Sequence, residues 1–418
     1  MLLVNKCTPG VHKRVTEENM RKLNKTAACG ILAAALAAGT LSGCSKAIDG
    51  TKTVATVGDE KVTLGLASYM VRDQQAQTTS YYNMLMSQYG VSGSASNVWD
   101  QKGDDGKTVG ESSKDGVMTT INQLYVLKAH AADYDVTITD DEEKAIKEAA
   151  AEFIKDNDEK ILKKLAVSED DIVTYLELVT IRSKMHDPMT ADVDTEVSAN
   201  EKDQTRVTIV KVSTEGTEKD DDGNTIDLTD EEKAQKKDLA QQVLDKVKAS
   251  DDVANADMDA LAKEVDDSLS ATAPAFTTAG DTDDTLDEAV QDAALELKDG
   301  EVADKVIEGD DGYYVVRLDK MLDEDATENK EKTVISERKS DLFDSTLEDW
   351  VKEEKIKVKD KVWDQITVTD SVSFVYKSAD SSDDTKSSDA QDSTEDTSSQ
   401  DNSEDTTTED TAAEDSAE

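Results

Sequence analysis

The sequence predicts an α+β fold in which a mostly helical region is interrupted by a small unit of strands and helices. Apolar residues recur at helical spacing between about residues 54 and 190, where Thr139-Asp-Asp-Glu142 and Ser168-Glu-Asp-Asp171 are capping boxes that start two helices. At Arg206 the pattern changes to RVTIVKV, which alternates as a strand does. A long amphipathic stripe then follows this unit and needs an apolar partner.

The N-terminal region begins with a predicted hairpin around the turn between Val57 and Val62 and then becomes helical. A further helix covers residues 121–128, and the second capping box opens a helix expected to end before Pro188. A loop rich in Gly, Ser and Asp is expected at about 90–116. Methionines and tyrosines are candidates for an adaptable binding surface, although a helical core would use the same residues; they are Tyr69, Met70, Tyr81, Tyr82, Met84, Met86 and Tyr89.

The middle region runs in the order strand, long helix, short helices, strand, strand. The strand at 206–212 leads through an acidic loop to a helix opened by Thr229-Asp-Glu-Glu232. Short helices follow at about 258–265 and 286–297, and Gly300 is expected to end the second. The segment VADKVIEGDDGYYVVRL then predicts two strands around an Asp-Gly turn.

The C-terminal helix carries Ile335, Leu342, Phe343, Leu347 and Trp350 at helical spacing, and the N-terminal helices are its simplest partner. From Ser378 onward the chain has fifteen acidic residues against Lys386 alone, with no apolar side chain larger than alanine. Such a segment buries too little surface to offset its chain entropy, so it is expected to be a disordered tail.

An export signal precedes the folded region. A basic stretch from Met20 leads into TAACGILAAALAAGTLSGC, an apolar run interrupted by Gly30 and Gly39 and too short for a retained membrane helix. Leu41-Ser42-Gly43-Cys44 resembles a bacterial lipobox, which implies lipidation of Cys44. Residues 1–19 are then an extension or a mis-assigned start. We expect an extracytoplasmic protein, lipid-anchored to the outer face of a bacterial cell membrane of the Gram-positive type.

Composition disfavours several classes of function. A net charge of −47 offers no basic patch for nucleic acid. Cys44 is the last cysteine, and only His130 and His186 follow it, each expected on a helix surface, so no metal site and no cofactor are predicted. The acidic loop at Glu218 to Thr229 approaches an EF-hand but places Thr229 where the bidentate glutamate belongs. Asp281, Asp283 and Asp284 are likewise expected to be solvated rather than to bind calcium.

Several segments together resemble a parvulin-type peptidyl-prolyl isomerase domain: TRVTIVKV, MDALAKEVDDS, AFTTAGD and LDEAVQDAALELKDGEVADKVIEGDDGYYVVRL. In layout the whole chain is similar to PrsA-like foldase lipoproteins, whose helical chaperone domain is SurA-like. This resemblance implies a signal peptide (1–43), an N-terminal helical chaperone domain (44–200), an inserted parvulin-like β-α-β-β domain (201–323), C-terminal helices that pack on the N-terminal domain (324–370) and a disordered acidic tail (371–418).

The sequence departs from the family at the expected catalytic positions. Matching strands puts the two usual histidines, which lie close together in the family's fold, at Val207 and Tyr314. The usual Cys or Asp falls near Asp267 or Ser268, and Phe276 and Tyr314 are candidates for substrate binding. Prolyl isomerisation needs a shaped apolar pocket rather than proton transfer to a leaving group, so the missing histidines need not abolish it. Their loss does remove the hydrogen-bond network that orders the pocket in the family, so weak or absent activity is expected.

The resemblance therefore implies a membrane-anchored foldase that binds unfolded or newly secreted polypeptides. One alternative is a fully active peptidyl-prolyl isomerase. The other is a structural or solute-binding envelope lipoprotein, but solute binding favours two similar α/β lobes, and the sequence indicates one.

Overall fold

The structure is a computed structural model that describes residues 36–41, 48–88, 98–216, 226–279 and 286–376. The described chain combines helices with antiparallel sheets, so the predicted α+β class is confirmed. Its apolar cores divide it into a helical lobe, with one core, and a sheet lobe, with a core on each face of the sheet.

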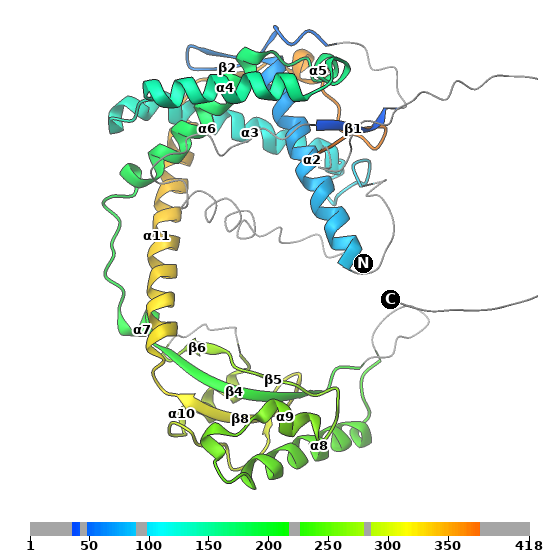
Figure 1. Ribbon diagram of the computed structural model, residues 1–418, viewed down its shortest axis with the longest axis vertical. Helices are drawn as coiled ribbons and strands as arrows, with labels where there is room; N and C mark the ends of the chain where they lie inside the picture. The colour runs from blue at the N-terminus through cyan, green and yellow to red at the C-terminus, as the bar shows by residue number, and fades with distance from the viewer. Residues whose placement is uncertain (1–35, 42–47, 89–97, 217–225, 280–285, 377–418) are drawn as a thin grey trace, which may run out of the picture. The chain divides into compact units, whose positions relative to one another are not determined.

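The helical lobe begins with the predicted hairpin, which turns at Gly58 with φ of 55°. Capping boxes start its helices at Thr108, Thr139 and Ser168, and satisfy backbone N–H groups that the first turn leaves unpaired. Its elements, several of which are labelled in Figure 1, are β1 (Leu36–Leu41), β2 (Thr53–Val57), β3 (Glu60–Thr63), α2 (Leu64–Gln88), α3 (Val109–His130), η1 (Ala131–Tyr134), α4 (Asp140–Asp156), α5 (Glu159–Leu165), α6 (Glu169–Met189), β9 (Ile356–Val358), α12 (Asp360–Trp363) and β10 (Val372–Tyr376).

The core of the helical lobe includes residues far apart in the chain. Buried side chains of α2, α3, α4 and α6 share one apolar cluster with Phe343 and Leu347 of α11 (Glu324–Glu353). Trp350 of α11 stacks on His130, with ring centroids 4.1 Å apart. The amphipathic stripe thus packs against the N-terminal helices, because its apolar positions recur on one face.

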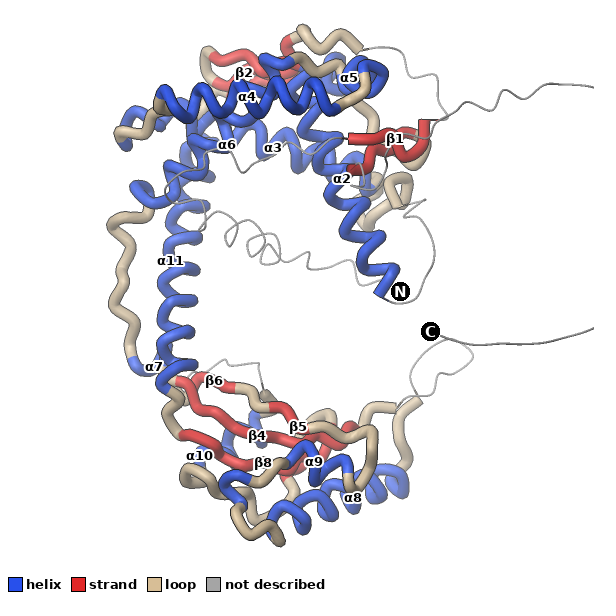
Figure 2. The backbone as a smooth tube through the Cα atoms, viewed as in Figure 1, coloured by secondary structure: helices blue, strands red, loops and turns tan. Residues whose placement is uncertain are grey.

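The sheet lobe is built around two long antiparallel strands, β4 and β8, in the order β5-β4-β8-β7, with β6 also paired to β4 (Figure 2). A capping box at Thr229 starts its long helix. Its elements are β4 (Gln204–Ser213), α8 (Asp230–Lys248), η2 (Val253–Asn255), α9 (Met258–Lys263), β5 (Ala271–Thr272), β6 (Ala275–Thr277), α10 (Glu288–Leu295), β7 (Ile307–Glu308) and β8 (Gly312–Lys320), with α7 (Ala199–Lys202) just before β4.

Helices cover both faces of this sheet. Val210, Val212 and Val315 point to the face packed against α8 and α9. Their neighbours Ile209 and Val316 point to the opposite face, which packs against α10. Because alternate residues of a strand face opposite sides, a sheet covered twice needs apolar residues at successive positions, and the run of seven buried residues from Gly312 to Leu318 in β8 meets that need.

Two expectations about element ends are wrong. The helix expected to end before Pro188 continues to Met189, with Pro188 inside its last turn. The expected start of the disordered tail at residue 371 is also wrong, because Val372–Tyr376 form β10, with Phe374 only 1% exposed. The segment VSFVY has the β-branched and aromatic residues of a strand.

Some predictions lie outside the described residues. These are the lipobox cysteine Cys44, Tyr89, the carboxylates of the acidic loop at 217–225 and those at 280–285, and the tail from 377. Within the ranges that are described, no helix is both long and apolar enough to cross a membrane.

Candidate functional site

Tyr314 lies on the α10 face of the sheet lobe, and its cross-strand partner is Lys211. Val207 instead pairs with Leu318, farther along the same two strands. Val207 and Tyr314 are therefore not cross-strand neighbours, because the antiparallel register sets Tyr314 four residues away from the partner of Val207 on β8. Val207 is fully buried, so its side chain belongs to the core.

Tyr314, Asp311 and Lys211 form a hydrogen-bonded group at the end of β8. The Tyr314 hydroxyl donates to Asp311 Oδ1, and Lys211 Nζ donates to Asp311 Oδ2 at 2.5 Å. The hydrogen bond from Lys211, followed by that from Tyr314, lowers the pKa of Asp311 below its ordinary value. Burial, followed by the bond to the Asp311 carboxylate, raises the pKa of Tyr314. The phenol is thus held protonated as a donor and is a poor proton acceptor.

The turn before β8 closes over the Tyr314 ring. Asp287, the N-cap of α10, accepts a 2.7 Å hydrogen bond from the Asp310 backbone N–H. A Cβ atom at Gly309 would lie 2.4 Å from Asp287 Oδ2 and 2.9 Å from Tyr314 Cε2. Glycine at 309 therefore permits a close approach of turn, helix and ring that any side chain would prevent.

Phe276 and Tyr314, the residues expected to bind substrate, are both core residues in this structure. Phe276 is 0% exposed and Tyr314 is 4% exposed, in one apolar cluster with Val290 and Ala294 of α10. Neither ring is open to solvent, and the assignment of Phe276 and Tyr314 to substrate binding stays a prediction. They occupy inward positions of β6 and β8, where α10 covers them.

Asp267 and Ser268 lie between α9 and β5 and are exposed. The Ser268 hydroxyl donates to Asp266 Oδ1 at 2.6 Å, which makes this segment a local turn. Cluster membership places α9 against the sheet face opposite to that of Tyr314. The expectation that Asp267 or Ser268 joins Tyr314 in one site is therefore wrong, because the chain reaches β5 from the α8 and α9 side.

Lys211 and Asp311 were missed as site residues, although the sequence carries a signal for one of them. In RVTIVKV, alternation places Val207, Ile209 and Lys211 on the same face. A lysine in line with two buried apolar residues needs a partner, and Asp311 supplies it. No local pattern links residues 211 and 311, because the pairing of β4 with β8 brings them together.

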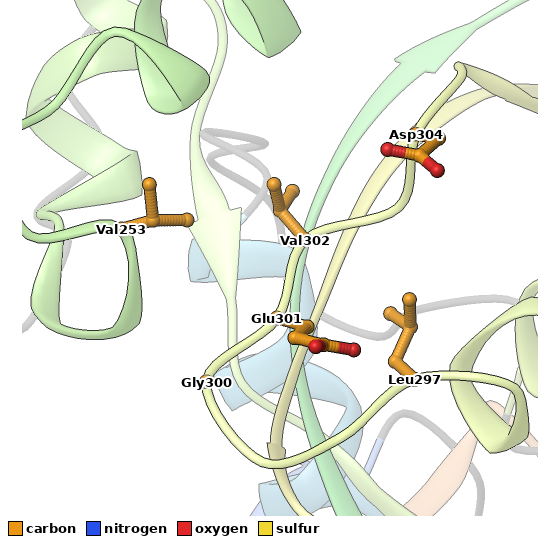
Figure 3. A pocket seen from close by; sticks show the side chains of 6 residues that line it. All are labelled: Val253, Leu297, Gly300, Glu301, Val302 and Asp304. Atoms are coloured by element: carbon orange, nitrogen blue, oxygen red, sulfur yellow. The ribbon is translucent and has the colours of Figure 1, made fainter.

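Figure 3 shows a hollow in the sheet lobe. Its volume is about 380 Å³, and its lining residues are Val253, Leu297, Gly300, Glu301, Val302 and Asp304. The lining contains neither Tyr314 nor Phe276 and includes two carboxylates but no cation or aromatic ring. This hollow is therefore not the prolyl-binding site that the resemblance implies.

The second half of α2 exposes a group of large apolar side chains. Tyr81, Met84 and Met86 are 49%, 55% and 38% exposed. Figure 1 shows this half of the helix running on beyond the helices that pack against its first half. Tyr69 and Met70, also proposed as adaptable surface, are core residues at 1% and 8% exposure. The candidate binding surface is therefore the end of α2, with Tyr82 partly buried beside it.

Neither remaining histidine belongs to a metal centre in the described part of the chain, where no group of three or more His, Cys, Asp and Glu side chains is placed to hold an ion. His130 stacks on Trp350, and its Nδ1 lies 2.9 Å from Asp133 Oδ2. His186 packs beside Phe343, with ring centroids 5.5 Å apart. Both side chains therefore have packing roles in the helical lobe.

One protein-family model matches the chain, from the acidic loop after β4 to the first turns of α11. Residues 219–331 match the family model of the PPIC-type PPIASE domain, so the predicted resemblance to parvulin-type isomerase domains is confirmed. No curated protein matches the chain.

Solved structures of foldases align with this chain over most of their own length. PrsA from Bacillus cereus is 19% identical over 63% of this chain and 94% of its own, with a TM-score of 0.28. PrsA from Streptococcus pneumoniae is 16% identical over 63% and 97%, with a TM-score of 0.23. A structure from a study of the SurA-like chaperones PEB4 and Cj1289 of Campylobacter jejuni is 15% identical over 63% and 100%, with a TM-score of 0.18.

Proposed function

We propose that this chain, which carries a PPIC-type isomerase domain within a helical protein, is an extracytoplasmic foldase that binds unfolded polypeptides. The observation that carries this proposal is the apolar end of α2, where Tyr81, Met84 and Met86 expose large flexible side chains. Methionine adapts to differently shaped partners because it is unbranched and polarisable, so such a surface suits clients of varied sequence.

The charge of the molecule supports a chaperone role of this kind. A net charge of −47 keeps copies of the protein apart while one of them holds an aggregation-prone chain. Binding through an apolar patch on a strongly charged protein combines attraction for exposed hydrophobic segments with solubility of the complex.

The test is suppression of aggregation of an unfolded client by the purified protein. The triple variant Tyr81→Ser, Met84→Ser, Met86→Ser is expected to lose most of the suppression seen at stoichiometric amounts. Ile226→Ser with Leu322→Ser is the matched control, because these side chains are 46% and 50% exposed outside α2. Equal suppression by both variants overturns the role of α2, and no suppression by the parent protein overturns chaperone function.

Prolyl isomerase activity is the second candidate function, and the PPIC-type match is the observation that favours it. We expect a rate near background, because Tyr314 and Phe276 are packed beneath α10 and a tyrosine bonded to Asp311 stands at one histidine position. An assay of cis-to-trans conversion of an X-Pro peptide tests this, with Tyr314→His beside it. A rate well above background in the parent protein favours an active enzyme instead.

The proposed location is the outer face of a cell membrane, through a lipid on Cys44. It rests on the basic stretch after Met20, the apolar run and the lipobox-like Leu41-Ser42-Gly43-Cys44. Mass spectrometry of the protein from membranes is expected to show Cys44 as the first residue, carrying a diacylglycerol. Cys44→Ser is expected to release the protein from the membrane fraction, and an unmodified chain that still contains residues 20–43 rejects the proposal.

A further inference from the structure

The short strand β1 is an extended segment seated in a slot of the helical lobe. It pairs antiparallel with β10, from Leu36 opposite Tyr376 to Leu41 opposite Val372, with an irregularity between Ala38 and Thr40. Leu36 is 0% exposed, and its backbone N–H donates to Asn157 Oδ1 at 2.9 Å. The slot thus combines a strand edge, a buried apolar position and a side-chain acceptor.

Contacts with α2 hold β10 from its own side, independently of β1. Gln75 Nε2 donates to the Val372 carbonyl at 3.0 Å, and the Tyr376 hydroxyl donates to Asp73 Oδ1 at 2.9 Å. Phe374 is 1% exposed, and the Arg72 guanidinium lies 5.0 Å from the centre of its ring. These contacts keep β10 in place when its edge has no partner strand.

The acceptor in the slot is also held without β1. Asn157 is 6% exposed and follows α4, and its Nδ2 donates to the Phe153 carbonyl at 2.8 Å, which orients the amide oxygen. An oriented, buried acceptor of this kind favours an extended backbone that presents an N–H to it.

β1 falls within residues 20–43, the segment proposed above as an export signal. Cleavage before Cys44 removes β1 and leaves the backbone groups of β10 that faced it without a partner. An exposed strand edge is a template for pairing with another extended chain. We propose that in the mature protein this slot, formed by the β10 edge and Asn157, binds an extended apolar segment of an unfolded exported polypeptide in place of β1. This inference rests on the proposed foldase function.

The sequence of β1, which fills the slot in this structure, indicates what kind of segment can bind there. β1 has the sequence Leu-Ala-Ala-Gly-Thr-Leu, without a charge, and backbone pairing reads little of the side-chain sequence. The tail after residue 377 is a poor occupant because it is rich in Asp and Glu. A second copy brings another net charge of −47 to the contact, which opposes association.

The experiment uses the full chain in detergent with a protease site placed between Leu41 and Cys44. The probe is a fluorescent peptide of sequence GILAAALAAGTLSG with a lysine pair added for solubility, followed by anisotropy. After cutting and dilution, the protein is expected to take up one peptide per chain, at least tenfold more tightly than the uncut protein. A probe with alternate backbone N-methyl groups is expected to lose this binding, because it keeps the side chains but lacks half of the N–H donors.

Asn157 provides a matched pair of variants. Asn157→Ala is expected to weaken uptake by about five- to tenfold, the usual effect of one lost hydrogen bond. Asn157→Asp keeps an acceptor but loses the Nδ2 donor that orients it on the Phe153 carbonyl, so its uptake is expected to lie between that of Asn157→Ala and that of the parent chain. Equal binding by both variants, together with equal binding of the N-methylated probe, overturns the strand-pairing model.

The remaining outcomes separate this proposal from the foldase function. If the cut chain takes up no peptide but still suppresses client aggregation, the slot proposal fails and the foldase function stands. If the cut chain forms dimers that the peptide does not dissociate, a second copy is the occupant and the proposal is overturned. Failure of both peptide uptake and aggregation suppression overturns both.

Discussion

The helical lobe and the sheet lobe treat their apolar side chains differently. In the sheet lobe, helices cover both faces, and the rings at the expected substrate positions, Phe276 and Tyr314, are 0% and 4% exposed. In the helical lobe, Thr79 is the last buried residue of α2, and beyond it Tyr81 and Met84 are exposed. The surface available to a client therefore lies on the helical lobe, whereas the isomerase-type face is filled by its own side chains.

The difference bears on the proposed function, because it separates the region with exposed apolar side chains from the region that matches an isomerase family model. Residues 219–331 of the sheet lobe region match an isomerase family model, and Tyr314, Asp311 and Lys211 form a hydrogen-bonded group where β8 begins. The helical lobe exposes large apolar side chains at the end of α2, and exposed apolar patches of this kind mark interaction sites. Four changes test this contrast, in order of expected effect on stability.

Phe276→Ala is expected to have the largest effect on stability. Removing a ring that is 0% exposed leaves a cavity among β6, β8 and α10 and is expected to lower the free energy of unfolding by about 3 to 5 kcal/mol. Denaturant unfolding of the full chain, followed by a signal from the sheet lobe, measures this. A loss below about 1 kcal/mol shows that the α10 face is open to solvent rather than packed.

Tyr314→Phe tests the hydrogen bond between Tyr314 and Asp311, where β8 begins. The ring stays in the cluster, but Asp311 loses one of its two side-chain donors, so a loss of about 1 kcal/mol in the free energy of unfolding is expected. Isomerase activity is expected to stay near its background value. If activity instead falls from a measurable rate, the hydroxyl is part of a working site.

The pH dependence of stability tests the same group. Lys211 and Tyr314 lower the pKa of Asp311, so its contribution is present above the unfolded pKa of about 3.9 and is lost as pH falls through the lower folded value. Because the Asp311 side chain is 44% exposed, the effect is expected to stay below about 1 kcal/mol.

Asp311→Asn is the matched variant for this pH dependence. Comparing unfolding curves of the parent and the variant between pH 2 and 6 isolates the contribution of this carboxyl from that of the many others. A parent and variant whose stabilities differ by the same amount at every pH contradict the assignment.

Tyr314 also has a consequence at high pH. Its pKa is raised by burial and by Asp311, so the folded state retains the proton above the unfolded pKa of about 10. Stability from this group is present below that pH and is lost as pH rises toward the folded pKa. Phenol absorbance during alkaline titration checks this, because Tyr314→Phe is expected to remove one tyrosine that ionises later than the exposed ones.

Met84→Ala is expected to change stability least, by less than about 0.5 kcal/mol, because the side chain is 55% exposed. The same change is expected to reduce client binding measurably. A large loss of stability would show that the end of α2 packs against another part of the protein and is not a free surface.

Local patterns predicted many of the secondary-structure elements. The capping boxes at Thr139, Ser168 and Thr229 start the helices expected of them, because the motif satisfies backbone donors within four residues. The alternation in RVTIVKV and the run in GYYVVRL predicted β4 and β8. The strand β10 was missed because the acidic residues that follow it dominate the composition of the segment.

The candidate site was predicted less well, since it depends on how strands pair. Tyr314 was correctly placed on the last long strand of the sheet lobe, but its partners Lys211 and Asp311 were not anticipated. A shift of register along two strands exchanges every cross-strand neighbour, and because β8 is buried at successive positions, alternation along it does not indicate which residue of β4 lies opposite. Phe276 was named for its ring, but only the packing of α10 shows that the ring is buried.

The sequence by itself determined the α+β class, the isomerase-type resemblance and the absence of histidine from residues 187 to 418. These properties depend on residue identity and on spacing within one element. Only the tertiary structure decided that Lys211 faces Tyr314, that α10 fills the expected substrate face, and that the end of α2 stays exposed. Contacts between distant segments set these features, because burial and register are properties of the packed chain.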